Sequence, residues 1–469
     1  MRDQPTAARD QAHAAPAPEA DTARLIADDK AYVWHPFTQM ADWLADEPLV
    51  IAAGEGSYLI DTTGRRYLDG VSSLWVTIHG HRHPVLDAAV RAQLDRIAHS
   101  TLLGLANVPA IELARRLVAL APPGLTKVFY AENGASAVEI ALKMAFQYWQ
   151  HRGEPQRTRF LSLQGAYHGD TLGAVSVGGI DLFHARFRPL LFPVLHAPQP
   201  YCYRCPLGKT HPACELACAE ALGDLLAAHA SEVAAVIVEP LVQGAAGMIT
   251  QPPGYLRRVR ALCDHYGVLL IADEVATGFG RTGRLFACEH EGVAPDLLVL
   301  GKGITGGYLP LSAVLTTQAV YDAFLGDYTE LKTFFHGHTY TGNQLCCAAA
   351  LANLDLFAQE DTLGRLQPKI ARLAKGLAPF RALAHVGEVR QRGFMVGIEL
   401  VADRATRAPY PLEARVGQRV CRAARERGAI LRPLGDVIVL MPPLCITEDE
   451  LEHLLAITYA SIVEVTEPC

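Results

Sequence analysis

The chain has 469 residues, of which 50% are hydrophobic and 19% charged, and its formal net charge is −7. Such a chain can bury a large core without metal or disulfide staples, and its acidic balance argues against nucleic acid or an anionic membrane as partner. No apolar run reaches the roughly 18 residues of a membrane helix and the start lacks a signal-peptide core, so we expect a cytoplasmic protein whose 11 cysteines are reduced.

The N-terminal part begins with residues 1–22, which are rich in Ala, Pro and Asp and predict a disordered tail. Next, Gly54–Tyr67 alternates polar and apolar residues between turn residues, which predicts a small antiparallel hairpin. The chain ends in a segment with helical character, Glu448–Val463.

The middle of the chain alternates short apolar runs with stretches of helical periodicity. The runs include Val128–Ala131, Val233–Val238, Val268–Ala272 and Leu297–Leu300, and the clearest helical stretches are Ile111–Leu120, Ala137–Trp149 and Tyr255–Tyr266. Continuous apolar runs separated by helices are typical of a buried, mostly parallel sheet with helices on both faces. We therefore predict an α/β protein with a large domain, 71–359, and a smaller α+β domain made of 23–70 and 360–469.

Three of the predicted strands deliver residues with useful chemistry at their carboxyl ends, where open parallel sheets bind ligands. Asp273 and Glu274 follow one run, Lys302 follows another between two glycines, and a third leads through Glu132-Asn-Gly-Ala-Ser136 into a helix. The spacing of about thirty residues between Asp273 and Lys302 suits one strand–helix–strand crossover, which predicts neighbouring strand ends.

These groups match the needs of a pyridoxal-phosphate (PLP) site. A lysine amine forms a Schiff base with the cofactor, a carboxylate keeps the pyridine nitrogen protonated, and a glycine-containing loop that opens a helix offers N–H groups to the phosphate. Each feature alone has a common structural explanation: Lys302 as a surface lysine, Asp273 as a turn former, and the glycine loop as a tight turn. Their coincidence in one sheet predicts the site.

Longer sequence segments surround these residues, among them LIADEVATGFGRTGRLF (Leu270–Phe286) and LVLGKGITGGYLPLSAV (Leu298–Val314). Together with WHPFTQM (Trp34–Met40) and VSSLWVTIHGHRHP (Val71–Pro84), they closely resemble the class III, fold type I aminotransferases. The match is closer to the branch that converts 8-amino-7-oxononanoate into 7,8-diaminopelargonate (7,8-diaminononanoate) in biotin synthesis. A broader ω-amino-acid:oxo-acid transaminase of the same class is the alternative.

The resemblance implies a role for each matching residue. Lys302 is expected to form the Schiff base, Asp273 to hold the pyridinium, and Tyr167 to stack on the cofactor ring. Gly134 and Ala135 are expected to bind the phosphate through their backbone N–H groups.

Further residues are implied at the substrate side and at a subunit interface. His338 and Thr339 are expected to bind phosphate across the interface of a homodimer with shared sites. Trp75 and Gly337 are expected to line the pocket for a small-molecule amine donor and a keto acceptor, and Arg432 to bind a substrate carboxylate.

Four positions depart from the pattern of the adenosylmethionine-using members or of general ω-transaminases. Leu74, Phe37 and Val439 stand where those adenosylmethionine-using members have aromatic residues. These replacements leave the amino donor open between adenosylmethionine and lysine. Ala276 stands where many ω-amino-acid transaminases have Gln, which favours the biotin branch.

Three other motifs have competing interpretations. GFGRTG (Gly278–Gly283) has the letters of a dinucleotide fingerprint but follows a finished strand and opens no clear helix. His79, His81 and His83 could form a metal site, but Gly80 and Pro84 among them favour a turn. Cys202, Cys205, Cys214 and Cys218 have spacings compatible with zinc, yet we favour reduced thiols and predict no metal.

Overall fold

The computed structural model describes residues 21–467. Most of the predicted disordered tail therefore lies outside the described residues. Its last two residues do not belong to a tail: the Asp21 carboxylate accepts a hydrogen bond from the backbone N–H of Arg24 and caps helix α1 (Thr22–Tyr32).

A seven-stranded sheet forms the centre of the protein, with strand order β4-β12-β11-β10-β7-β5-β6. The only antiparallel strand of this sheet is β12, which runs against both β4 and β11, so the predicted mostly parallel sheet is confirmed. The strands are β4 (Leu125–Ala131), β5 (Arg159–Leu163), β6 (Val194–Ala197), β7 (Val233–Val238), β10 (Leu269–Asp273), β11 (Leu297–Leu300) and β12 (Ser312–Thr317).

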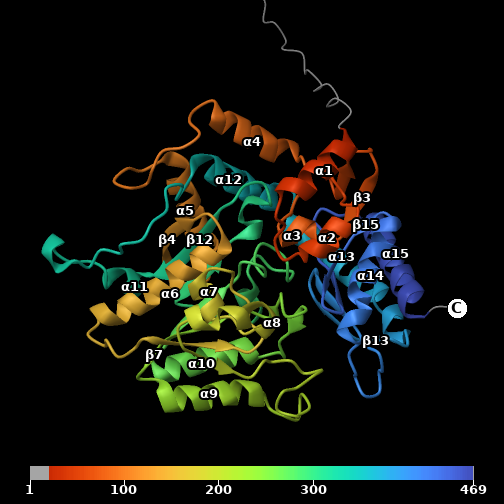
Figure 1. The fold of residues 1–469 in the computed structure, drawn as a ribbon. Coiled ribbons are helices and arrows are strands. Elements are labelled where there is room, and N and C mark those ends of the chain that lie inside the picture. Colours follow the sequence, from red (N-terminus) through yellow and green to blue (C-terminus); the bar gives the residue numbers. More distant parts are fainter. Residues whose placement is uncertain (1–20, 468–469) are drawn as a thin grey trace, which may run out of the picture.

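Helices cover both faces of this sheet (Figure 1). Alternate residues of β10 show the division, since Leu270 packs in the core cluster of one face and Ile271 in that of the other. The first face is covered by α5 (Val108–Leu120), α9 (Ala217–His229), α10 (Tyr255–Tyr266) and α12 (Gln344–Gln359), and the second by α6 (Gly134–His151), α7 (Leu172–Ser176) and α11 (Gln318–Asp322).

The N-terminal and C-terminal parts lie side by side, as the red and blue segments of Figure 1 show. The predicted hairpin is confirmed and is longer by one strand: β1 (Ile51–Glu55), β2 (Tyr58–Asp61) and β3 (Arg66–Asp69) form an antiparallel meander. Strand β15 (Ala429–Ile430) then adds to β3 in parallel.

A second antiparallel sheet comes from the C-terminal part and has the order β13-β14-β17-β16. Its strands are β13 (Val386–Arg392), β14 (Met395–Leu400), β16 (Arg432–Leu434) and β17 (Val437–Leu440), accompanied by α13 (Thr362–Gly376), α14 (Val416–Glu426) and α15 (Glu448–Thr466). The predicted domain boundaries at 70/71 and 359/360 stay a prediction.

The shorter elements complete the chain. They are α2 (Met40–Ala45), α3 (Ser72–Trp75), α4 (Pro84–Leu94), α8 (Asp181–His184), β8 (Val242–Gln243), β9 (Ile249–Thr250), and the 3-10 helices η1 (Ala185–Leu190), η2 (Ala287–His290), η3 (Lys302–Thr305), η4 (Tyr328–Glu330), η5 (Pro379–Ala382) and η6 (Leu412–Ala414). Between residues 21 and 467, no helix has the length and apolar character needed to cross a membrane.

The connection from β10 to β11 differs from the predicted crossover. The two strands are parallel neighbours as expected, but their connection contains only the short 3-10 helix η2 and no α-helix. Gly280 and Gly283 adopt φ angles of 90° and 98°, a conformation that cannot continue a right-handed helix. The spacing therefore predicted the strand order correctly and the connecting element wrongly.

Candidate active site

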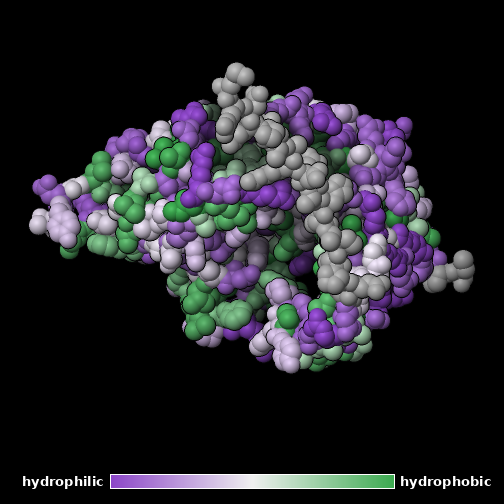
Figure 2. All heavy atoms as spheres, turned by 90° about the horizontal axis from the view of Figure 1, so that it is seen from above, coloured by the Kyte–Doolittle hydropathy of each residue, from purple (hydrophilic) through white to green (hydrophobic). Residues whose placement is uncertain are grey.

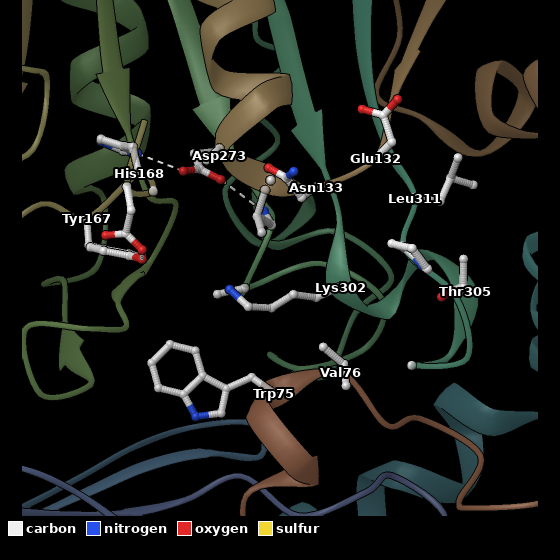
Figure 3. Close-up of a pocket in the computed structure, with 18 of the residues that line it drawn as sticks. Trp75, Val76, Glu132, Asn133, Tyr167, His168, Asp273, Lys302, Thr305 and Leu311 are labelled. Atoms are coloured by element: carbon white, nitrogen blue, oxygen red, sulfur yellow. Dashed lines mark hydrogen bonds and ion pairs between the residues drawn. The ribbon is translucent and has the colours of Figure 1, made fainter. Parts of the chain in front are cut away.

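A cavity of about 750 Å³ opens at the carboxyl edge of the seven-stranded sheet. Its lining includes the residues that follow three strands, namely Asn133 after β4, Asp273 at the end of β10 and Lys302 after β11, together with Tyr167 and Trp75. The structure thus brings the three predicted strand ends to one place (Figure 3).

Lys302 reaches into the cavity from the first residue of η3. In Figure 3 its side chain extends between the Asp273 carboxylate and the Trp75 indole, and Nζ lies 5.3 Å from the centroid of the indole ring. Burial lowers the pKa of this amine, while the charges of Asp273 and Glu239 oppose the shift. A lysine with a lowered pKa is more readily available as a neutral nucleophile.

Asp273 is held in place on both of its carboxylate oxygens. Oδ2 lies 2.7 Å from Nδ1 of His168, and Oδ1 accepts a hydrogen bond from the backbone N–H of Val275 at 3.0 Å. Both side chains of the Asp273–His168 pair are buried. Such a fixed carboxylate can hold a positively charged group of a ligand in the cavity. Sequence reasoning missed His168, although it directly follows Tyr167 in the same loop.

The N-terminus of α6 forms another wall of the cavity. The Asn133 side chain accepts a hydrogen bond from the backbone N–H of Ser136 at 2.9 Å and caps the helix. Within the described chain, the backbone N–H groups of Gly134 and Ala135 donate to no protein acceptor. A Cβ atom on Gly134 would lie 2.7 Å from Cγ1 of Val275, so only glycine fits without displacement. Free N–H groups at a helix start suit an anion such as phosphate.

Two aromatic residues border the cavity near Lys302. The Tyr167 hydroxyl donates to Oδ2 of Asp170 at 2.8 Å, and its backbone N–H donates to Oε1 of Glu239 at 3.0 Å. Trp75 is 6% exposed and packs in a buried cluster with Leu241. Glu239 was missed by sequence reasoning even though it follows the apolar strand β7, which is the same signal that identified Asp273.

Four predicted site residues do not line this cavity within the chain. Gly337, His338 and Thr339 are exposed, and Nδ1 of His338 lies 2.6 Å from Oε2 of Glu132, a residue at the cavity edge. Arg432 starts β16 and is half-buried. Burial lowers its pKa, while the nearby Tyr167 opposes the shift, and its Nε finds no acceptor between residues 21 and 467.

The GFGRTG loop has a structural task. Arg281 is 1% exposed, and its guanidinium donates to the carbonyl oxygens of Pro442 and Thr77, each at 2.8 Å. Burial lowers the pKa of Arg281 to about 9. No α-helix begins at the third glycine, Gly283, so the loop lacks the strand–turn–helix context of a dinucleotide site.

The histidines of the predicted turn, His79, His81 and His83, contact different polar or aromatic partners, and the His79 and His83 rings also lie edge-on with their centroids 6.0 Å apart. His79 packs edge-on against Phe357, Nε2 of His81 lies 3.0 Å from Asp69, and Nε2 of His83 lies 3.3 Å from Glu360. In residues 21–467 no three His, Cys, Asp or Glu side chains are grouped so as to hold a metal ion.

The four clustered cysteines surround a cavity of about 20 Å³, apart from the large one. Cys202, Cys205, Cys214 and Cys218 are all free thiols. The absence of a metal site stays a prediction.

Comparisons with known proteins find relatives over nearly the whole chain. The chain is 59% identical over 454 residues to the adenosylmethionine-8-amino-7-oxononanoate aminotransferase of Nitratidesulfovibrio vulgaris, covering 96% of this chain and 84% of the relative. A crystal structure of the adenosylmethionine-8-amino-7-oxononanoate aminotransferase from Methanocaldococcus jannaschii superposes with a TM-score of 0.91 at 50% identity, covering 95% of this chain and 100% of that one.

A PLP-bound amine transaminase from an uncultivated Pseudomonas species superposes with a TM-score of 0.88 at 41% identity, covering 92% of this chain and 99% of that one. The family model described as aminotransferase class-III matches residues 40–462. With this match over most of its length, the chain belongs to the class-III aminotransferases, enzymes that transfer amino groups with pyridoxal phosphate as cofactor.

Proposed function

We propose that this protein is the transaminase that converts 8-amino-7-oxononanoate into 7,8-diaminononanoate in biotin synthesis. The observation that carries the proposal is that Lys302 and Asp273 line the same cavity and come from neighbouring strand ends. The high identity to the Nitratidesulfovibrio and Methanocaldococcus enzymes supports the substrate.

The residues of the cavity fit PLP. Lys302 offers an amine with a lowered pKa for covalent attachment, and the carboxylate of Asp273, fixed by His168, would hold the pyridinium nitrogen. Gly134 lets the first turn of α6 pack closely against Val275, and the N–H groups of Gly134 and Ala135, which have no acceptor in the described chain, would bind the phosphate. When bound, PLP supplies an electron sink that stabilises negative charge next to the reacting carbon.

The side chains of the protein then divide the remaining work. Lys302, with Nζ as a free amine, would hold and move a proton as general base and acid. Tyr167 and Trp75 line the cavity and would help to exclude water from the reacting atoms. The guanidinium of Arg432 would bind the substrate carboxylate with its fork of donors.

The amino donor in this proposal is adenosylmethionine or lysine. Leu74 and Phe37 replace aromatic residues and are 45% and 58% exposed, while Val439 is buried. These smaller or non-hydroxylated side chains change the surface that a bulky donor would contact. The donor is therefore the first property to measure.

We also propose a homodimer with shared active sites. Figure 1 shows the segment that follows α11 extending away from the body of the chain, and it carries Tyr328 and Phe335, which are 94% and 72% exposed. Figure 2 shows hydrophobic patches among hydrophilic residues on the face seen from above. Because His338 and Thr339 follow this segment and do not line their own cavity, they are available to a partner subunit.

A cytoplasmic location completes the proposal. All ten cysteines between residues 21 and 467 are free thiols, which suits a reducing compartment.

The test is a discontinuous assay for 7,8-diaminononanoate from 8-amino-7-oxononanoate, with adenosylmethionine or lysine as donor in separate reactions. Product in either reaction supports the proposal and names the donor. The Lys302→Ala variant is the control and should form no product. If the wild-type protein binds PLP but forms no product with either donor, the proposed substrate is wrong and the broader ω-amino-acid activity should be assayed.

A further inference from the structure

A second carboxylate, not used in the mechanism above, lies next to Asp273. Glu239 directly follows β7, and β7 pairs with β10 in a register that places Val238 beside Ala272. Glu239 and Asp273 therefore emerge from adjacent strands at the same edge. Both line the cavity, and they are 4% and 5% exposed.

Both oxygens of Glu239 accept hydrogen bonds from backbone N–H groups of two different loops. Oε1 accepts from the N–H of Tyr167 at 3.0 Å, and Oε2 accepts from the N–H of Gly244 at 2.9 Å. Gly244 packs against the Trp75 ring, since a Cβ atom on it would lie 3.3 Å from Cζ3 of the indole. One carboxylate thus connects the backbone of Tyr167 to the backbone of Gly244, against which the Trp75 ring packs.

The loop around Glu239 is itself fixed. The Glu239 carbonyl oxygen accepts a hydrogen bond from Nε2 of Gln251 at 2.8 Å, and Oε1 of Gln251 accepts from the N–H of Leu241 at 3.0 Å. These hydrogen bonds fix the position of the Glu239 carboxylate. The carboxylate in turn fixes the backbones of Tyr167 and Gly244.

The charge of Glu239 also acts on Lys302. The charged groups that face Lys302 are Asp273 and Glu239, which favour its protonated form, and Arg281, which opposes it. Those that face Glu239 include His168 and Asp273. Burial raises the pKa of Glu239 to about 7, and the charge of Asp273 adds to this rise while that of His168 opposes it.

We propose that Glu239 is a positioning residue of the transamination, which fixes Tyr167 and the Gly244 surface under Trp75 through two backbone hydrogen bonds and holds a second negative charge beside Lys302. The inference rests on the proposed attachment of the cofactor to Lys302. It does not depend on which amino donor or acceptor the enzyme uses.

The chain offers a matched control in Glu274. This residue is also fully buried, its two oxygens accept from the backbone N–H groups of Ala287 and Cys288 at 2.6 and 2.8 Å, and burial raises its pKa to about 7 as well. Glu274 does not line the cavity. Glu239→Gln and Glu274→Gln each replace one of two acceptors by a donor, but only the first change touches the site.

The experiment titrates the visible absorbance of the PLP-loaded enzyme with pH, above pH 7, where Glu239 is ionised. Removal of one nearby negative charge should lower the midpoint for the nitrogen that joins Lys302 to the cofactor by about one pH unit in E239Q. In E274Q the midpoint should stay at the wild-type value. In steady-state assays E239Q should lose about tenfold in kcat/KM, the equivalent of one buried hydrogen bond, and E274Q should not.

Either an unchanged midpoint in E239Q or the same shift in E274Q would overturn the proposal. If E239Q does not fold, Glu239→Asp decides, because the shorter side chain cannot reach both N–H groups; full kcat/KM in that variant would overturn it. The proposed attachment of the cofactor to Lys302 has a separate test: it is wrong if the visible band of the attached cofactor persists in Lys302→Ala.

Discussion

Replacing Gly134 by alanine tests the proposed phosphate-binding wall of the cavity. A Cβ atom at this position would lie 2.7 Å from Cγ1, 3.0 Å from Cγ2 and 3.4 Å from Cβ of Val275. Carbon atoms pack best at about 3.5–4.0 Å, so relief of the closest contact requires a displacement of about 1 Å. Either the first turn of α6 or Val275 must move, and both line the cavity.

The expected magnitude follows from two opposing effects. Overpacking of this kind costs about 1–3 kcal/mol, whereas alanine in place of glycine in a helix returns up to about 1 kcal/mol. The net cost is about 1–2 kcal/mol, and we expect it to appear in cofactor binding because the displaced groups form the cofactor wall. The dissociation constant for PLP should then rise by about fivefold to thirtyfold.

The assay is a titration of the apoenzyme with PLP, followed by the visible band, for wild type and Gly134→Ala. Thermal unfolding of the two apoenzymes measures how much of this cost falls on the fold itself. Gly223→Ala is the control, because its Cβ would meet Cδ2 of Leu262 at 3.0 Å in a helix pair away from the cavity. An unchanged PLP affinity in Gly134→Ala would refute the assignment of this wall to the phosphate.

Three further predictions follow from the site and its surroundings. Lys302→Ala should lose the visible band of the attached cofactor and fall by more than about a thousandfold in kcat, since it removes both the attachment point and the proton carrier; spectra and rates measured together check this. Arg432→Met should raise KM for the carboxylate-bearing substrate by about tenfold to a hundredfold with a smaller effect on kcat, because a charge-assisted pair contributes to binding; an unchanged KM would remove Arg432 from the substrate site. In Glu274→Gln, stability relative to wild type should improve as pH rises from 5 to 8, because burial raises the pKa of Glu274 from its usual 4.5 to about 7 and wild type therefore loses stability across that window; urea unfolding should show a change of up to about 3 kcal/mol, and a constant difference would contradict the raised pKa.

The central sheet and the core of the site were predictable because both are encoded locally. Strands buried on both faces need continuous apolar runs, which mark β7, β10 and β11 in the sequence. Parallel strands end at one edge, so Asp273 and Lys302 could be expected to meet. Glu239 obeys the same rule after β7 and could have been found by applying it to every strand.

What only the tertiary structure decided depends on contacts between distant residues. The pairing of β3 with β15 joins residues about 360 positions apart, and the buried Arg281 links Thr77 to Pro442. No local sequence pattern predicts such partners, because they depend on which backbone groups still lack a hydrogen bond once the sheets have formed. The same holds for the orientation of Asp273: its position came from the sequence, whereas the hydrogen bond from His168 that fixes its carboxylate exists only because the fold brings two separate strand ends together.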